Sequence, residues 1–241
     1  MAAPAAWCRR LEAGLERLQC QLDSSQRARL LAYIALLHKW NQAFNLTAVR
    51  DPLSMIDRHL LDSLALLPHL PVGAALDVGT GAGLPGIPLA IARPQQPFCL
   101  LDSNGKKVRF VRQVVQELDL TQVVRPVQAR VERACCADLQ QATCFDVVIS
   151  RAYAALPDFL ASTAHLLSPA GTWLAMVGRA DALPPLPPAA DVRAELIPLP
   201  DAVEPGDRHL VRLTRIQCTQ QGAGSLSWTV SEQAADQAVE S

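Results

Sequence analysis

The chain has 241 residues, of which half are apolar and 19% are charged, and its formal net charge is −1. This composition indicates a folded globular protein with one main core and a smaller appended segment, and it argues against wholesale disorder. Because the net charge is close to zero, a role in nucleic-acid binding would have to rest on a local basic patch.

The seven cysteines are scattered and show neither a C-x-x-C pair nor a His-linked metal spacing. We therefore expect no disulfide framework and no metal site, and the expected location is the reducing cytoplasm. The sequence has no secretory signal and no run of eighteen apolar residues, so secretion and a membrane span are not expected.

Residues 1–72 are expected to be helical. One helix follows the capping candidates DSS at 23–25 and carries apolar side chains on one face as far as Trp40. A second helix begins with Asp51 as its cap and Pro52 in its first position, and its helical spacing continues to Pro68. Residues 41–50 interrupt the period and are expected to form a connector.

The pattern changes at Ala74 to short apolar runs separated by helical stretches. The expected strands are residues 74–78, 98–102, 123–129, 145–150 and 172–178. Such alternation predicts a doubly wound, Rossmann-like α/β domain over residues 73–217, with residues 1–72 as an N-terminal helical extension.

The end of the chain is less regular. Residues 180–207 hold many of the prolines and are expected to form a long irregular connection. It leads to a last strand at 208–216, which we expect to be an edge hairpin partner. The polar tail 218–241 is expected to be disordered.

The stretch DVGTGAGLPG at 77–86 follows the first predicted strand. Its glycines allow the backbone to turn sharply and to approach a ligand, and the next strand ends at Asp102, where an acid binds a ribose diol in this architecture. The alternative is a structural turn, with Asp102 capping the helix that starts near Asn104. The order strand, glycines, helix, strand and acid favours a nucleoside site.

Two cofactors fit this loop. GAGLPG at 81–86 matches the dinucleotide fingerprint. Asp77 lies two residues before Gly79, where its charge would repel a pyrophosphate and would suit the ammonium of S-adenosyl-L-methionine. The methyl donor is therefore favoured over a nicotinamide dinucleotide.

Several motifs make the prediction more specific. In order, the chain contains HKWNQAFNLTAVRDP (38–52), RHLLDSLAL (58–66), DVGTGAGLPGIPLAI (77–91), LLDSNGKKVRF (100–110), ARVE (129–132) and FDVVISRAYA (145–154). Between about residues 24 and 216 the sequence resembles the bacterial guanine-N7 methyltransferases of small-subunit ribosomal RNA, the glucose-inhibited division protein B family.

The resemblance implies methyl transfer from S-adenosyl-L-methionine to N7 of a guanine in 16S ribosomal RNA. It also implies a class I methyltransferase fold in which the helical extension acts as a substrate cap. Its expected cofactor contacts are the loop residues Asp77, Gly79, Gly81, Gly83 and Leu84, the ribose and adenine contacts Asp102, Ser103, Val131 and Glu132, and Arg151 beside the cofactor.

Guanine N7 has a lone pair and no proton, so methyl transfer to it needs no general base, and Arg151 is expected at most to position substrate or cofactor. Methylation of an exocyclic amine usually involves an Asn/Asp-Pro-Pro-aromatic run after the fourth strand, where this chain has SRAY at 150–153. Two other functions remain open: a small-molecule methyltransferase, and a ribosome-assembly or nucleotide-sensing binding protein without turnover.

A local basic face is a candidate for RNA binding. Lys106, Arg109 and Arg112 recur at helical spacing, with Arg130 downstream, although a solvated helix face is the alternative. His59 and Asp62 lie three residues apart, which we interpret either as a polar helix face or as hydrogen bonds to the NLTAVR connector, rather than as a metal site. The expected partner is the small ribosomal subunit or its RNA, and we expect a monomer.

Overall fold

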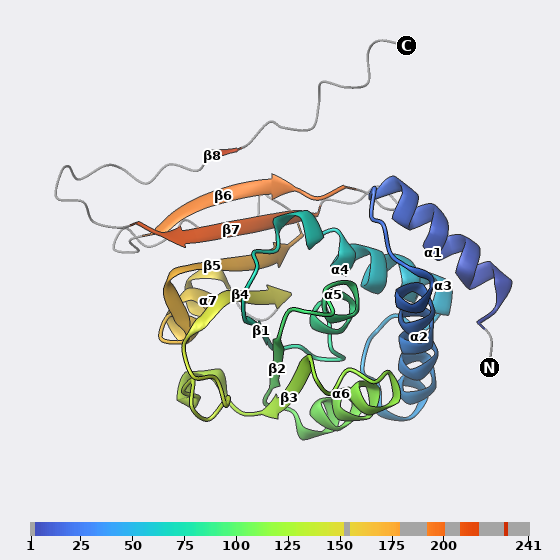
Figure 1. Ribbon diagram of the computed structural model, residues 1–241, viewed down its shortest axis with the longest axis horizontal. Helices are drawn as coiled ribbons and strands as arrows, with labels where there is room; N and C mark the ends of the chain where they lie inside the picture. Colours follow the sequence, from blue (N-terminus) through green and yellow to red (C-terminus); the bar gives the residue numbers. More distant parts are fainter. Residues whose placement is uncertain (1–2, 152–154, 179–191, 201–207, 217–228, 231–241) are drawn as a thin grey trace, which may run out of the picture.

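The computed structural model describes residues 3–151, 155–178, 192–200, 208–216 and 229–230. They form a single sheet with helices on both faces (Figure 1). The α-helices are α1 (Ala5–Arg17), α2 (Ser24–Phe44), α3 (Pro52–Met55), α4 (Asp62–Leu64), α5 (Gly86–Ala92), α6 (Gly105–Glu117) and α7 (Leu156–Thr163). The strands are β1 (Ala75–Val78), β2 (Phe98–Asp102), β3 (Val124–Gln128), β4 (Phe145–Arg151), β5 (Leu167–Val177), β6 (Val192–Pro198), β7 (His209–Arg215) and β8 (Thr229–Val230).

The strand order is β3-β2-β1-β4-β5-β7-β6-β8. Neighbouring strands from β3 through β5 are parallel, and β7 pairs antiparallel with both β5 and β6. The strand order reverses beside β1, because β1 pairs with β2 on one side and with β4 on the other. Ligands of doubly wound folds bind at such a point, outside the carboxyl ends of the strands.

The predicted doubly wound α/β fold is confirmed, and the five predicted strands correspond to β1–β5. Except at one end, the predicted and observed strand ends differ by no more than one residue. The exception is β5, which begins at Leu167 rather than at 172. Its pairing with β4 is interrupted between Phe145 and Val147, where the register jumps from Leu167 to Thr172. The extra residues of β5 bulge out of the ladder. The apolar pattern in the sequence therefore indicated only the regular part of the strand, which begins at Thr172.

The prediction for residues 180–207 was wrong in part, because β6 lies inside this segment. Its sequence VRAELIP alternates between buried and exposed positions for the first three residues, and the strand ends at Pro198. A proline at a strand end removes no central ladder bond, so the surrounding prolines do not prevent pairing. As a result β7 is not an edge strand, since β6 covers its other side.

The helix that starts after Asp23 is longer than expected. Asp23 accepts the backbone N–H of Gln26, and the Gln26 side chain in turn accepts the Asp23 N–H, which is a complete capping box. The helix continues past Trp40 to Phe44 and ends at Asn45, a left-handed residue with φ 49°. The expected connector 41–50 is therefore reduced to its second half.

The second N-terminal helix is not continuous. Asp51 caps it by accepting the Ser54 N–H, and Pro52 occupies the first turn, as predicted. After α3, residues Ile56–Leu61 form a π-helix, η1, before α4 begins, and a short 3-10 turn, η2, spans Leu67–His69. A second 3-10 turn, η3 (Val131–Arg133), follows β3. π-Helical turns are rare and often occur at functional sites.

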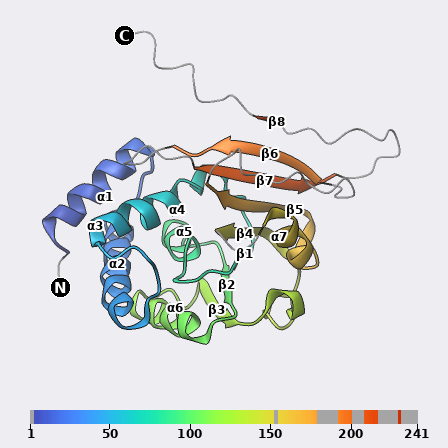
Figure 2. The same cartoon turned by 180° about the vertical axis from the view of Figure 1, so that it is seen from behind.

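The two faces of the sheet bury separate cores. One contains side chains of α1, α2, η1, α5 and α6, and the other contains side chains of η3 and α7. The N-terminal helices, α1 to α4 with η1, will be called the helical layer, and in both views α1 and α4 lie near the hairpin β6–β7 (Figure 2). The helical layer thus shares one continuous core with the helices that follow β1 and β2.

The expected disordered tail, 218–241, lies outside the described residues except for β8, which pairs with β6. Among the helices that the structure describes, none is long and apolar enough to cross a membrane.

We predict that Asp23→Ala lowers the free energy of unfolding by about 1 kcal/mol, because the first turn of α2 loses its side-chain cap. The measurement is urea denaturation followed by circular dichroism. Ser25→Ala, in the same exposed turn, is the control and should leave the midpoint unchanged. Equal losses in the two variants would contradict this role of Asp23.

Candidate functional site

The glycine loop between β1 and α5 uses left-handed backbone at three positions. Gly79, Gly81 and Gly83 have φ values of 67°, 60° and 89°. Residues with a side chain rarely adopt such φ values, so this turn requires glycine at these positions. At the start of the loop, directly after β1, the Gly79 N–H donates to the Leu101 carbonyl of β2 over 2.8 Å.

The glycines have different neighbours. A Cβ on Gly81 would have only the Gly79 carbonyl at 3.8 Å and Lys107 Nζ at 4.0 Å within reach, so this position faces open space. A Cβ on Gly83 would lie 2.6 Å from Ile87 Cγ1, and one on Gly86 would collide with Leu100. Gly81 therefore leaves room for a ligand, whereas Gly83 and Gly86 allow α5 to pack closely on the sheet.

Asp102, at the end of β2, connects the glycine loop to α6. Its Oδ2 accepts the Gly81 N–H over 2.9 Å, and its Oδ1 accepts the Asn104 N–H over 2.8 Å. The cap of α6 is Asn104, whose Oδ1 accepts the Lys106 N–H over 3.0 Å. The alternative in which Asp102 caps the helix is therefore wrong, because that position is taken by Asn104.

A pocket of about 300 Å³ opens beside these groups at the carboxyl ends of β1, β2 and β3. Its volume is at the lower end of the range of small-molecule sites, roughly 300–1,000 Å³. It is lined by Gly79, Leu101, Asp102, Ser103, Lys107, Ala129, Arg130, Val131 and Glu132. Five expected cofactor contacts, Gly79, Asp102, Ser103, Val131 and Glu132, thus lie around one cavity.

Two other residues that line the pocket were not expected there from the sequence. Arg130, expected to contact RNA, forms part of the pocket wall, and Lys107 was not among the expected site residues. Lys107 lies in the first turn of α6, three residues after its cap Asn104. Its Nζ lies 4.0 Å from the position of a Cβ on Gly81, so its side chain faces the glycine loop, and this proximity depends on the fold.

A larger hollow of about 510 Å³ lies near the amino ends of β2 and β3 and is lined in part by Arg112. Ligand sites of doubly wound folds lie at the opposite, carboxyl edge, so the smaller pocket is the candidate site. Arg112 is therefore separated along α6 from Lys106, which is near the pocket end of the helix.

Asp77 is fully buried below the loop. Its Oδ2 accepts the Thr80 hydroxyl over 2.6 Å and the Gly86 N–H over 2.9 Å, while its Oδ1 has no hydrogen-bond partner among the described residues. Burial raises the pKa of this carboxyl to about 7, with the nearby Asp102 charge adding to the rise. Asp77 thus fixes both ends of the loop and keeps one oxygen unsatisfied.

Arg151 ends β4 on the other side of β1. Its Nη2 donates to the Arg58 carbonyl over 2.8 Å, and its Nη1 is buried without a partner in the described part of the chain. Its positive charge lowers the pKa of Asp77, so the two groups interact electrostatically. An unsatisfied carboxylate oxygen and an unsatisfied guanidinium N–H fit a ligand with an ammonium and a carboxylate, such as the methionine end of S-adenosyl-L-methionine.

Of the other two expected contacts, Leu84 lies in the core next to Pro85 and is 9% exposed. Gly83 is buried against Ile87, as described above. Neither lines the pocket of about 300 Å³, and the same holds for Asp77, Gly81 and Arg151. Their expected contact with a cofactor therefore stays a prediction.

The helical layer forms hydrogen bonds to the glycine loop and to the end of α5. The buried Tyr33 hydroxyl donates to the Ala82 carbonyl over 2.9 Å, and the Gln26 amide donates to the Ile91 and Ala92 carbonyls at the end of α5. Sequence reasoning treated Tyr33 only as part of an apolar face. A phenol in the middle of that face was the available signal, because a buried hydroxyl needs a partner.

The predicted bond between His59 and the connector is confirmed. Thr47, in the NLTAVR segment, lies with its Oγ1 2.9 Å from His59 Nε2. Burial, together with the charges of Arg151 and Arg58, lowers the pKa of His59 to about 4. His59 is therefore neutral at pH 7.

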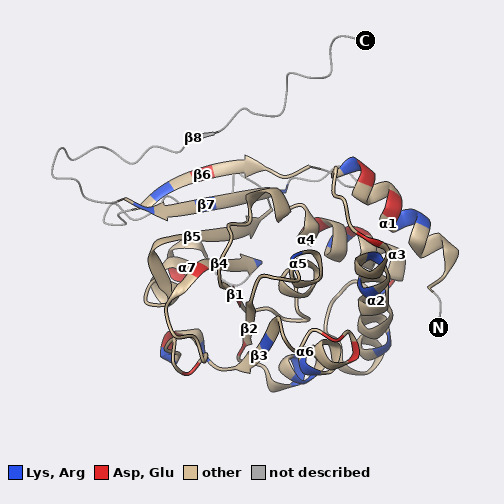
Figure 3. Ribbon diagram, in the orientation of Figure 1, with Lys and Arg blue, Asp and Glu red and all other residues tan. Residues whose placement is uncertain are grey.

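The basic positions of α6 are exposed. Lys106, Arg109 and Arg112 all lie on the solvent side of the helix, and Figure 3 shows the positive charges along α6. On α1, in contrast, both signs of charge are present, with Asp/Glu between Lys/Arg at either end. The structure brings Lys106 and Arg109 to the half of α6 nearer the pocket.

We predict that Asp77→Asn flattens the pH dependence of stability. The raised pKa means that folding favours the protonated carboxyl, so the contribution of Asp77 is greatest below pH 4 and is lost as the pH rises toward 7. The loss amounts to roughly 4 kcal/mol for a shift of about three pKa units. Urea denaturation of the ligand-free protein between pH 4 and 8 measures it, and parallel curves for the two proteins would contradict the assignment.

Comparison with known proteins identifies relatives over most of the chain. The family model described as rRNA small subunit methyltransferase G matches residues 26–183. Ribosomal RNA small subunit methyltransferase G of Chromohalobacter salexigens is 52% identical over 211 residues, covering 86% of this chain and 96% of its own. The protein of the same name from Vibrio vulnificus is 45% identical over 209 residues, with the same coverage.

Solved structures share the fold at low sequence identity. The S-adenosylmethionine-dependent methyltransferase SibL superposes with a TM-score of 0.52 at 17% identity, covering 87% of this chain and 70% of its own. A SAM-dependent methyltransferase from Aquifex aeolicus gives a TM-score of 0.51 at 15% identity, with coverages of 72% and 97%. Together with the match over residues 26–183, the sequence identities show that the chain belongs to the rRNA small subunit methyltransferase G family.

Proposed function

We propose that the protein transfers a methyl group from S-adenosyl-L-methionine to N7 of a guanine in the 16S RNA of the small ribosomal subunit. Family membership supports S-adenosylmethionine-dependent methylation of small-subunit ribosomal RNA. The observation that carries the assignment of the site is the glycine loop, with its adjoining pocket and the two unsatisfied buried atoms on Asp77 and Arg151.

The bound cofactor would supply an electrophilic methyl group on a sulfonium. Asp102 and Ser103 would hold its ribose, and Val131 and Glu132 would flank its adenine, because these residues line the pocket. Gly79, Gly81, Gly83 and Leu84 would enclose the methionine end. Asp77 and Arg151 would meet its ammonium and carboxylate.

Guanine N7 can attack the methyl carbon without losing a proton, so the site needs alignment rather than a base. The side chains around the loop suit this task. Both oxygens of Asp102 hold backbone N–H groups, one oxygen of Asp77 does so, and the neutral His59 is bonded to Thr47. The proposed catalysis is therefore the positioning of nitrogen, methyl carbon and sulfur in line.

RNA contacts are proposed for the basic side chains of α6 and for Arg130. Lys106 and Arg109 are exposed near the pocket, and Arg130 lies on its wall. Arg112 is farther from the site and would contact a more distant part of the RNA. The N-terminal extension, residues 1–72, would act as a substrate cap, and a monomer would suffice because the proposed site is built from one chain.

The test is to incubate the protein with radiolabelled methyl donor and small subunits, or bare 16S RNA, that lack the modification. Borohydride and aniline treatment then cleaves RNA at N7-methylguanosine. Label that coincides with a cleavage site supports the proposal. Labelled RNA without cleavage would contradict N7 as the target, and unlabelled RNA would favour a small-molecule methyltransferase or a binding protein without turnover.

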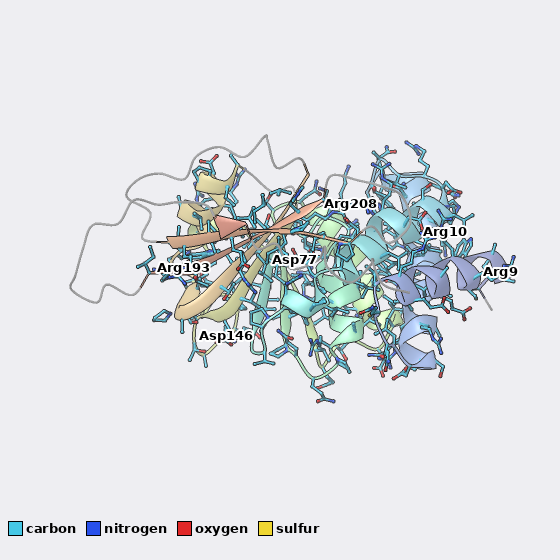
Figure 4. The ribbon with its side chains drawn as sticks, turned by 90° about the horizontal axis from the view of Figure 1, so that it is seen from above. Arg9, Arg10, Asp77, Asp146, Arg193 and Arg208 are labelled. Carbon is cyan, nitrogen blue, oxygen red and sulfur yellow. The ribbon has the colours of Figure 1, made fainter. Side chains whose placement is uncertain are left out.

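We predict that Lys106→Ala with Arg109→Ala weakens RNA binding and lowers its salt dependence, by about one unit of slope for each phosphate contact removed. Fluorescence anisotropy at several salt concentrations measures both effects. Arg9→Ala is the matched control, because Arg9 is an exposed cation on α1, at the far end of the helical layer from the strands (Figure 4). If the salt dependence of RNA binding is unchanged in the double variant, this face of α6 is exposed to solvent and does not contact RNA.

A further inference from the structure

We propose that Asp62, on the helical layer, is the positioning residue that holds Arg151 in the orientation required for methyl transfer. Asp62 is 8% exposed and begins α4. Its Oδ2 lies 3.3 Å from Arg151 Nη2, and its Oδ1 lies 3.3 Å from Arg208 Nε. One carboxylate thus binds arginines from the end of β4 and from the residue before β7.

The π-helix explains why this turn holds Arg151 twice. The Asp62 N–H is shared between the His59 carbonyl and the Asp57 carbonyl five residues earlier, the second being the bond of a π-helix. In an α-helix it would donate to the Arg58 carbonyl, four residues earlier. Here the Arg58 carbonyl accepts Arg151 Nη2 over 2.8 Å. The shifted ladder therefore offers a backbone acceptor beside the Asp62 carboxylate.

Holding Nη2 determines where the rest of the guanidinium points, because the group is planar and rigid. With Nη2 placed between Asp62 and the Arg58 carbonyl, Nη1 lies buried and without a partner among the described residues. This free donor is the one that the proposed function assigns to the ligand, so the inference rests on that assignment of Arg151.

The charges around Asp62 indicate what its loss would do. Arg58, Arg151 and Arg208 all lower the pKa of Asp62, although burial raises it more. His59 is neutral and contributes no charge. Without the carboxylate, Arg151 and Arg208 would repel each other across a partly buried gap, and Arg151 would lose one of the two groups that orient it. Figure 4 shows Arg208 between the strands and the helical layer.

Asp57 provides a matched control on the same π-helix. It is 6% exposed and accepts Arg10 Nε over 2.8 Å, so it also forms a buried ion pair. Arg10 lies on α1, which Figures 1 and 2 both show apart from β4. Asp57→Asn should therefore destabilise the protein as Asp62→Asn does, without changing the position of Arg151.

The experiment compares Asp62→Asn, Asp62→Glu, Arg151→Gln, Asp57→Asn and the double variant Asp62→Asn/Arg151→Gln. Total methyl incorporation into unmodified small subunits gives kcat and the KM for the methyl donor, and thermal denaturation gives Tm. Asp62→Asn should lower kcat/KM about tenfold, mainly through KM, and Asp62→Glu should restore part of it. The double variant should be no worse than Arg151→Gln, and Asp57→Asn should lower Tm with kcat/KM unchanged.

Three results would overturn the inference: an unchanged kcat/KM in Asp62→Asn, losses that multiply in the double variant, or an equal loss of kcat/KM in Asp57→Asn. An unchanged kcat/KM would mean that Asp62 does not influence the site. Multiplying losses, or an equal loss in Asp57→Asn, would mean that Asp62 only stabilises the fold. Because total methyl incorporation does not depend on which atom is methylated, a failure of the N7 assignment is detected separately by the cleavage assay. A fully active Arg151→Gln would overturn both the inference and the assignment of Arg151.

Discussion

The site depends on two buried carboxylates that hold the glycine loop. Asp77 fixes the beginning of the loop through Thr80 and its end through the Gly86 N–H, and Asp102 fixes its middle through the Gly81 N–H. Both acids end parallel strands, so their carboxylates meet at one edge of the sheet. The loop can keep its left-handed backbone because backbone N–H groups within it donate to the oxygens of these two side chains.

The helical layer completes this arrangement and is not simply attached to it. Tyr33 bonds to the loop at Ala82, Gln26 bonds to the end of α5, and Asp62 bonds to Arg151 at the end of β4. Each of these contacts joins residues far apart in the sequence, within a core that both parts of the chain share. A change in the helical layer can therefore reach the cofactor edge without a direct contact to ligand, through elements packed against each other.

The strands and caps could be predicted because they depend on local patterns. The structure has helix caps at Asp23 and Asp51 and strands at the apolar runs of β1–β4, as the sequence predicts. β6 and η1 were missed for different reasons: β6 is stabilised by pairing with β7, a tertiary contact, and a π-helix leaves no periodic signal distinct from an α-helix over one or two turns. Lys107 and Tyr33 were missed because their roles depend on which loop the fold places opposite them.

The unsatisfied atoms at the site have an energetic meaning. A buried carboxylate oxygen and a buried guanidinium N–H without partners each cost free energy in the ligand-free protein, and the raised pKa of Asp77 reflects that cost. If the ligand contacts both atoms, as the proposed function assigns, it recovers this free energy on binding, and part of its affinity then comes from the fold. Stability of the ligand-free protein and affinity for the ligand should therefore be opposed at Asp77, since a change that satisfies Oδ1 internally removes the reason for the ligand to bind there.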